Sequence, residues 1–272
     1  NLPTTGEPEL TRWKDFLYKL KYPKHEVEIG LVGKYVELKD SYKSISEAFI
    51  HAGSTNECDV KIRWIHSEKI TDKNAEHIFK GLDGILVAPG FGERGFEGKI
   101  ATVKFARENK IPFMGICFGM QASVVEFARN VIGWEDANTS EISKDSKHPV
   151  IDLMEAQKKV TEYGGTMRLG ANDCDLKEGS LAQKVYKRKE VSERHRHRYE
   201  FNGDFLADFE KNGMIATGVN PDTGLVEIVE IPEHPWFIGV QFHPEYKSTV
   251  ANPHPLFVGF VKAAIEHNQL EQ

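Results

Sequence analysis

The feature that most constrains the fold of this chain is an alternation of short apolar segments with helical patterns. The apolar segments are rich in Val and Ile, as buried strands are, and comprise EVEIGLV (26–32), DVKIRWI (59–65), GILVAPG (84–90) and IPFMGI (111–116). Helical patterns follow them at SYKSISEAFIHAG (41–53), DKNAEHIFKG (72–81), EGKIATVKFARENK (97–110) and GMQASVVEFARN (119–130). Because such alternation builds βαβ units, we predict an α/β fold with a mostly parallel central sheet flanked by helices. Gly53 is predicted to cap the first of these helices.

The second half of the sequence lacks this regular alternation of apolar segments and helical patterns. Residues 134–190 are polar and are predicted to be largely irregular, apart from the strand-like GGTMRLG (164–170). Short strands then return at HRHRYEF (195–201), MIATGV (214–219), GLVEIVEI (224–231) and WFIGVQF (236–242), and HPLFVGFVKAAIEHN (254–268) predicts a closing helix. We therefore expect a small antiparallel excursion attached to one α/β domain.

Composition and the N-terminal segment narrow the class of protein. The net charge of −6 argues against nucleic-acid or membrane-surface binding, and no apolar run approaches the roughly 20 residues that cross a bilayer. The segment NLPTTGEPEL lacks a basic and an apolar region, so it is not interpreted as a signal peptide. Three cysteines without a C-x-x-C pair favour a reducing, cytoplasmic location. Residues 1–23 are predicted to be a linker with a leading helix, residues 24–268 the main domain, and the initial Asn indicates a fragment or processed chain.

Cys117 is the first candidate for chemistry. It follows the strand IPFMGI and precedes the helix GMQASVVEFARN, with Gly115 and Gly119 two residues away on either side. This is the G-x-nucleophile-x-G pattern of a sharp strand-to-helix turn, in which the next backbone N–H, here that of Phe118, faces a developing oxyanion. The helix N-terminus also favours a thiolate. The alternative is an inert core cysteine, which a lone cysteine in an apolar run usually is.

A thiolate nucleophile needs a base, and the segment VQFHPEY (240–246) supplies a candidate. His243 ends the strand WFIGVQF, and Glu245 lies two residues further on. Because the carboxyl ends of parallel strands meet at one edge of a sheet, His243 can reach Cys117 and Glu245 can fix the imidazole tautomer. Taken alone, His243 would be interpreted as a surface histidine at a strand end.

The segments GICFGMQ (115–121) and FHPE (242–245) together resemble the class I (triad) glutamine amidotransferases. Within that family, GGTMRLG and RHRHRYE (194–200) are similar to the glutaminase domains of enzymes that aminate UTP. The resemblance covers residues 24 to 266 and implies a three-layer flavodoxin-like or Rossmann-like fold. It also implies a reaction in which Cys117 forms a γ-glutamyl thioester with L-glutamine, releasing ammonia, while His243 acts as base and acid and Glu245 orients it.

The same resemblance assigns roles to further residues. The backbone N–H groups of Gly90 and Phe118 would form the oxyanion hole, and Phe91 would be a wall of the glutamine pocket. The residues implied to hold the α-amino and α-carboxylate groups of glutamine, together with Gly90 and Phe91, are Gln121, Glu141 and Arg198. Arg94 lies in the loop that responds to the activator GTP in the family. The loop APGFG (88–92) departs from the usual Pro-Gly-Gly-Phe-Gly, since Pro89 removes one N–H donor, and Phe118 stands where Leu is usual.

The resemblance further implies partners outside this sequence. The family's N-terminal amidoligase (synthetase) domain binds ATP, UTP and Mg²⁺ and receives the ammonia, and no G-x-x-x-x-G-K-[ST] loop occurs here. The full-length enzymes form homotetramers largely through that domain, so we expect this chain alone to be monomeric or weakly associated. No cofactor is expected in this domain. The alternatives are another triad amidotransferase, a γ-glutamyl hydrolase or a catalytically silent regulatory domain.

The run RHRHR (194–198) has competing interpretations as a metal or nucleic-acid site. On a strand, His195 and His197 would share one face and the arginines the other, and two histidines without a third ligand make a weak metal site. We therefore predict no metal site and no nucleic-acid binding. Cys58 and Cys174 are predicted to be structural, and the glycosylation-like NTS (138–140) is interpreted as a chance match.

Overall fold

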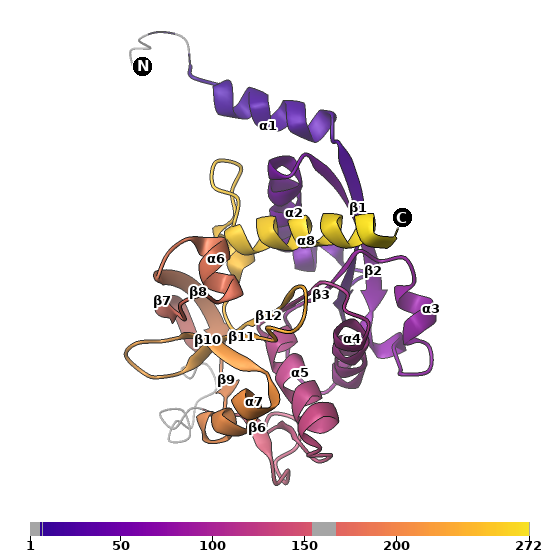
Figure 1. The fold of residues 1–272 in the computed structure, drawn as a ribbon, viewed down its shortest axis with the longest axis vertical. Coiled ribbons are helices and arrows are strands. Elements are labelled where there is room, and N and C mark those ends of the chain that lie inside the picture. Colours follow the sequence, from indigo (N-terminus) through magenta and orange to yellow (C-terminus); the bar gives the residue numbers. More distant parts are fainter. Residues whose placement is uncertain (1–5, 7, 154–166, 272) are drawn as a thin grey trace.

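The computed structural model of the protein describes residue 6, residues 8–153 and residues 167–271. Its central sheet has nine strands, in the order β2 (Cys58–His66), β1 (His25–Gly33), β3 (Gly84–Val87), β4 (Phe113–Ile116), β12 (Phe237–Val240), β11 (Val226–Glu230), β10 (Ile215–Val219), β7 (Arg168–Leu176) and β8 (Glu190–His197) (Figure 1). A second sheet contains β5 (Asn138–Thr139), β6 (Pro149–Leu153) and β9 (Tyr199–Phe201). The predicted α/β fold is confirmed.

The central sheet has a parallel part and an antiparallel part. Strands β2, β1, β3, β4 and β12 run parallel to one another, as the alternating pattern predicts. Strands β11, β10, β7 and β8 then continue the same sheet in antiparallel pairs. The predicted antiparallel excursion is therefore an extension of the sheet rather than a separate unit. The carboxyl ends of β3, β4 and β12 lie side by side, because β4 pairs with both of the others.

Helices cover both faces of the parallel part. Helices α2 (Lys43–Thr55) and α8 (Pro255–Glu271) pack together on one face, and α4 (Phe96–Glu108) and α5 (Phe118–Phe127) pack on the other (Figure 1). The strands alternate between the two resulting cores: Leu31 and Leu86 belong to the α2–α8 side, Val32 and Val87 to the α4–α5 side. Residues buried on both faces explain why these strands are apolar runs.

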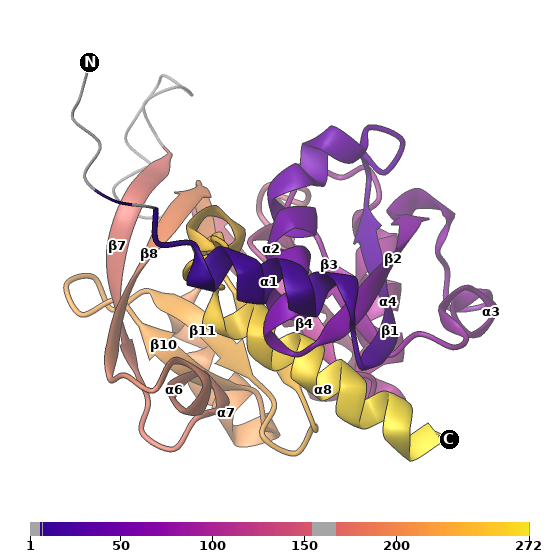
Figure 2. The same cartoon turned by 90° about the horizontal axis from the view of Figure 1, so that it is seen from above.

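Shorter helices lie at the periphery of this core. They are α1 (Thr11–Lys21), α3 (Ala75–Phe79), α6 (Leu181–Tyr186) and α7 (Leu206–Asn212). Helix α1, the predicted leading helix, contacts α2 and lies outside the layers, as Figure 2 shows from above. Within the described residues, no helix combines the length and the apolar character needed to cross a membrane.

Two sequence predictions about local structure are wrong. Gly53 does not cap a helix, because α2 continues to Thr55 and Asn56 is its C-cap. Its role is close packing: a Cβ at Gly53 would lie 2.6 Å from the carbonyl oxygen of Cys58 at the start of β2. The described part of residues 134–190 is not largely irregular, since it contains β5, β6, the whole of the long strand β7 and helix α6.

The reason for the second error is visible in the burial of β7. Its inward positions include Arg168, Gly170 and Asn172 while Leu169 is exposed, so the strand lacks the apolar alternation of a half-buried strand. Helix α6 is short and begins at Ser180, whose hydroxyl accepts a hydrogen bond from the N–H of Gln183 at 3.1 Å. Of the predicted strand at 164–170, residues 164–166 lie outside the described part, as do residues 1–5 and 7 of the predicted linker.

Gly119 provides a test of how tightly α5 packs on the sheet. A Cβ at this position would lie 2.2 Å from the carbonyl oxygen of Val87, a backbone atom that can move only with β3. We expect Gly119→Ala to lower the free energy of unfolding by about 1–3 kcal/mol, the usual cost of overpacking. Gly203→Ala is the matched control, since no atom lies within 4 Å of its added Cβ. Equal urea midpoints for the two variants would contradict this account of the packing.

Candidate active site

Cys117 occupies a strained turn at the junction of β4 and α5. Its φ of 53° and ψ of −105° are unusual for a residue with a side chain. The flanking glycines allow the turn, because a Cβ at Gly115 would lie 2.8 Å from the backbone of Gly119. The core-cysteine alternative is not supported, since the Cys117 side chain is nearly buried yet lines a pocket of about 560 Å³.

His243 and Glu245 follow β12, the strand beside β4. Nδ1 of His243 donates to Oε1 of Glu245 at 2.7 Å, because a carboxylate can only accept. The ring of Tyr246 stacks on that of His243 with centroids 4.9 Å apart. Burial disfavours the imidazolium, but the charges and hydrogen bonds of Cys117 and Glu245 outweigh it and raise the pKa of His243 to about 11. The structure thus brings the three predicted triad residues together at the carboxyl ends of β4 and β12.

The pocket in front of Cys117 collects most of the sequence-predicted residues. It is lined by Tyr35, Leu38, Ser41, Tyr42, Pro89, Gly90, Phe91, Cys117, Gln121, Glu141, Met167, Arg196, His197, Arg198, Tyr199, His243 and Tyr246. Arg94 does not line it: this side chain pairs with Glu68 at 2.6 Å, and its guanidinium lies 5.6 Å from the ring centroid of Tyr35, a pocket residue. A larger, more open hollow of about 810 Å³ lies on the other side of Tyr246 and does not include Cys117.

Opposite charges meet in this pocket. Oε1 of Glu141 accepts a hydrogen bond from the N–H of Gly92 at 2.9 Å. Burial raises the pKa of Glu141, and the Gly92 N–H and the positive charges of Lys34 and Arg198 act against that rise. Glu141 and Arg198 therefore lie close enough to interact, one as an anion and one as a cation. A ligand with an ammonium and a carboxylate on neighbouring atoms fits such a pair.

Gln121 is held by its own side-chain amide. Nε2 donates to the carbonyl oxygen of Tyr199 at 2.9 Å and to Oε1 of Gln241 at 3.2 Å. Nε2 of Gln241 in turn lies 3.8 Å from Sγ of Cys117. The two amides thus form a chain that ends at the cysteine sulfur and fixes which face of Gln121 is offered to the pocket.

The loop that follows β3 is held at three points. Nζ of Lys99 donates to the carbonyl oxygen of Ala88 at 2.5 Å, Nζ of Lys34 donates to that of Phe91, and Glu141 accepts from Gly92. Gly90 lies between these attachments and lines the pocket. Phe118 is the first residue of α5, where backbone N–H groups have no acceptor within the helix. The two N–H groups predicted for an oxyanion hole thus flank the strained turn, and Pro89 offers none.

Three residues that contact the lining of the pocket, without being part of it, escaped the sequence analysis. Gln241 could have been found, because it lies two residues before His243 and strand alternation places both side chains on one side. Lys34 directly follows β1, also at a carboxyl strand end. Lys99 gave no signal, since a lysine within a helical pattern is normally solvated, whereas here its side chain is 1% exposed.

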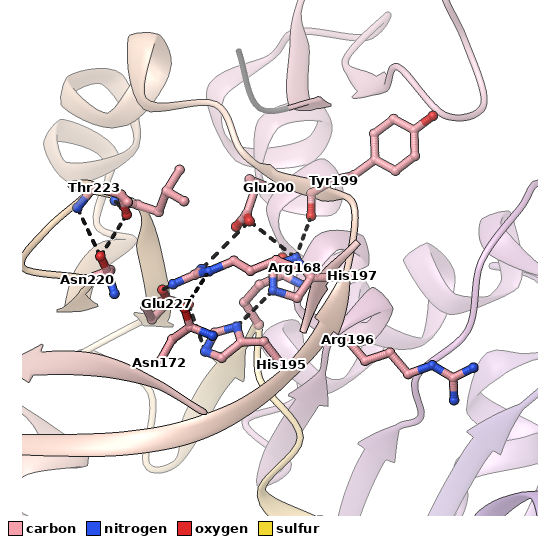
Figure 3. A network of polar contacts seen from close by, with 12 residues as sticks. Arg168, Asn172, His195, Arg196, His197, Tyr199, Glu200, Asn220, Thr223 and Glu227 are labelled. Atoms are coloured by element: carbon pink, nitrogen blue, oxygen red, sulfur yellow. Dashed lines mark hydrogen bonds and ion pairs between the residues drawn. The ribbon is translucent and has the colours of Figure 1, made fainter. Parts of the chain in front are cut away.

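Behind the pocket lies a buried network of charged and polar groups, drawn in Figure 3. Arg168 pairs with Glu227 at 2.6 Å and with Glu200 at 3.7 Å, and His195 and His197 are hydrogen-bonded to each other at 2.8 Å. The histidines face inward and Arg196 points away, as strand alternation predicts. Burial lowers the pKa of His195 to about 3 and raises that of Glu227 to about 7.

This network reaches the pocket through His197, which lines it, and through a shared backbone group. Nδ1 of His197 hydrogen-bonds to the carbonyl oxygen of Tyr199 at 3.2 Å, the same oxygen that accepts from Gln121. The network therefore braces the wall of the pocket. Across the described ranges, no three His, Cys, Asp or Glu side chains are placed to hold a metal ion.

Known proteins resemble this chain in sequence and in structure. Residues 37–263 match the family Glutamine amidotransferase class-I. CTP synthase of Cytophaga hutchinsonii is 65% identical over 97% of this chain and 49% of its own length, and CTP synthase of Flavobacterium psychrophilum is 61% identical over 98% and 50%. The chain thus spans about half the length of the curated relatives it matches.

A solved structure gives the same result for the fold. The glutaminase domain of Trypanosoma brucei CTPS, with bound acivicin, superposes on this chain with a TM-score of 0.83. The two sequences are 39% identical, and the superposition covers 88% of this chain and 94% of that domain. The arrangement of strands and helices described above is therefore that of a CTPS glutaminase domain over nearly the whole of both chains.

The burial of the cysteines predicts selective alkylation. Burial raises the pKa of Cys58 to about 12 and also raises that of Cys174, so both remain unreactive thiols, whereas Cys117 faces the pocket beside a cationic His243. We expect iodoacetamide at neutral pH to modify Cys117 alone, as read by peptide mass spectrometry. Cys117→Ser should abolish the adduct and Cys58→Ser should leave it unchanged. An adduct on Cys58 or Cys174 at comparable rate would refute the assignment.

Proposed function

The chain belongs to the class-I glutamine amidotransferase family, and we propose that it hydrolyses L-glutamine to glutamate and ammonia at Cys117. The observation that carries the proposal is the arrangement of Cys117 on a strained strand-to-helix turn beside the buried His243–Glu245 pair. The pocket in front of it offers Glu141 and Arg198 as an opposite-charge pair. A free amino acid with an amide side chain fits both features: its ammonium and carboxylate groups fit the charged pair, and its amide fits the nucleophile.

The reaction begins with attack of the Cys117 thiolate on the side-chain amide carbon of glutamine, which forms the C–S bond. The N–H groups of Phe118 and Gly90 stabilise the negative charge that develops on the amide oxygen. His243 Nε2 gives a proton to the amide nitrogen, and ammonia leaves as the C–N bond breaks. Water then attacks the γ-glutamyl thioester with His243 as base, releasing glutamate and restoring the thiolate. Glu245 stabilises the imidazolium and holds its tautomer.

Recognition of glutamine rests on the remaining pocket residues. Glu141 would bind the α-ammonium group, and Arg198 would bind the α-carboxylate with its planar fork of donors. Gln121 would contact the same end of the substrate, and the exposed ring of Phe91 would cover it. With its charged end bound by Glu141 and Arg198, glutamine would present its side-chain amide to the sulfur of Cys117 in the same pocket.

The relatives suggest where the ammonia goes. Since they are CTP synthases about twice as long as this chain, we propose that a synthetase domain of the same polypeptide receives the ammonia and aminates UTP with ATP and Mg²⁺ in pyrimidine biosynthesis. GTP activation near Arg94, a homotetrameric full-length enzyme and a cytoplasmic location belong to the same proposal. A γ-glutamyl hydrolase, another amidotransferase or a silent regulatory domain is less favoured, because the named relatives at 61–65% identity are CTP synthases.

Loss of the nucleophile tests the activity directly. We expect Cys117→Ser to lower glutamate release from L-glutamine at least about 10³-fold, because a hydroxyl in this site is a far weaker nucleophile than a thiolate. The assay measures glutamate and ammonia, with the synthetase domain supplied. Cys58→Ser serves as the matched control and should keep full activity. Full activity of the Cys117→Ser variant, or none in the unaltered protein, would sink the proposal.

The charged pair tests substrate recognition separately. Arg198→Met and Glu141→Gln should each raise KM for L-glutamine by about 10–100-fold, since each removes a charged hydrogen bond worth about 1.5–3 kcal/mol. Alkylation of Cys117 by iodoacetamide should proceed at the unaltered rate in Arg198→Met. Arg194→Met is the control, because Arg194 lies on β8, four residues before Arg198, is exposed and does not line the pocket. A KM effect as large for Arg194→Met would contradict the assignment.

A further inference from the structure

Lys99 is a charged side chain in an unusual place. It lies within helix α4, only 1% exposed, and ranks among the largest fully buried side chains of the protein. Its Nζ donates one hydrogen bond, to the carbonyl oxygen of Ala88 at 2.5 Å. No carboxylate of the described residues lies within ion-pair distance of it. Burying an ammonium without an anionic partner is costly, so the amine loses its proton readily unless a nearby negative charge stabilises the charged form.

The ammonium lies behind the two backbone groups of the proposed oxyanion hole. A Cβ at Gly90 would be 3.5 Å from Nζ of Lys99, so the ammonium lies against that glycine. Nζ also lies 5.0 Å from the ring centroid of Phe118, the residue after the nucleophile. Its hydrogen bond orients the Ala88–Pro89 peptide plane, which precedes the N–H of Gly90. Because Pro89 donates nothing, the orientation of that single N–H matters more here than in a loop with two donors.

The charges around Lys99 come from several elements. Lys34 after β1 repels it, while the negative charge of Cys117 attracts it across the turn between β4 and α5. His243 after β12 faces the same sulfur, and Glu141 faces Lys34 and Arg198. Burial lowers the pKa of Lys99 to about 7, Lys34 lowers it too, and Cys117 opposes both. Because Nζ of Lys99 lies against Gly90 and the ring of Phe118, a negative charge on the nucleophile or on the oxyanion formed from it would stabilise the ammonium.

We propose that Lys99 is a positioning residue of the oxyanion loop, whose ammonium fixes the Ala88 carbonyl and provides a buried positive charge when Cys117 or the tetrahedral intermediate is negative. The assignment rests on the proposed glutaminase reaction for the intermediate, but the coupling of Lys99 to the Cys117 thiolate stands without it. If Lys99 only filled space, removing its charge would leave the position of the loop unchanged.

The test replaces Lys99 by Met, which keeps the length and the apolar stem and removes both the charge and the hydrogen bond to the Ala88 carbonyl. Iodoacetamide alkylation of Cys117 is measured from pH 5 to 9, and glutaminase kcat and KM are measured with the synthetase domain supplied. In Lys99→Met we expect alkylation of Cys117 to be slower by up to about tenfold at the acidic end of this range, because a buried positive charge that favours the thiolate is gone. We expect kcat to fall at least about tenfold and KM to change less than about threefold, because the charge acts after glutamine binds.

Lys104→Met is the control on the same helix, since Lys104 pairs with Asp72 on the surface at 3.1 Å and contacts no active-site group among those described. It should match the unaltered protein in both assays. An alkylation profile and kcat unchanged in Lys99→Met would overturn the inference. A shifted alkylation profile in a protein that releases no glutamate would support the Lys99–Cys117 coupling and refute the glutaminase proposal, so the two failures are distinguishable.

A measurement on the unaltered chain covers the case in which Lys99→Met does not fold. Lys99 can be followed by NMR in protein with ¹³C-labelled lysine side chains, before and after alkylation of Cys117. Alkylation replaces the thiolate with an uncharged thioether, so the pH at which Lys99 titrates should fall by about one unit. A titration of Lys99 that alkylation leaves unchanged would overturn the inference.

Discussion

The backbone conformation of Cys117 is the constraint on which the rest of the site depends. A residue with a side chain at φ 53° and ψ −105° exists only where its surroundings hold it. Here β4 is fixed between β3 and β12, and α5 packs so closely on β3 that only glycine fits at 119. The sheet and the helix thus force the chain through a turn that it would not adopt alone. That turn brings the sulfur out of the core and directs the first N–H groups of α5 at the same point.

Charge inside the protein follows the same geometry. Most surface ion pairs here join exposed partners, which contribute little to stability in water. Many buried ionisable groups of the described residues, by contrast, lie around the pocket or behind it: Lys34, Lys99 and His243 in front, Glu227 and Glu200 with Arg168 behind. Buried ionisable groups are more expensive than apolar ones, so their concentration at one edge of the sheet indicates function rather than stability.

The sequence contains enough to predict the fold and the nucleophile, and the physical reason is locality. Strands buried on both faces are apolar runs, and the turn at Cys117 needs its glycines within two residues. His243 and Glu245 are also adjacent in the chain. Glu141 and Arg198 could be placed only by resemblance, because nothing local distinguishes them from solvated residues. Strand β7 and Lys99 were missed for a related reason. Polar side chains are buried there through contacts with residues distant in the sequence, and periodicity does not reveal such contacts.

The carbonyl oxygen of Tyr199 accepts hydrogen bonds from both sides, from Gln121 in the pocket and from His197 in the buried network. Two separate parts of the molecule therefore share one atom, and a shift of either moves the other. Thermodynamic linkage makes this relation reciprocal: a state of the antiparallel strands that improves the pocket wall must itself be favoured when the pocket is occupied, by the same free energy. The antiparallel half of the sheet therefore supports the pocket wall and also responds when the pocket is occupied.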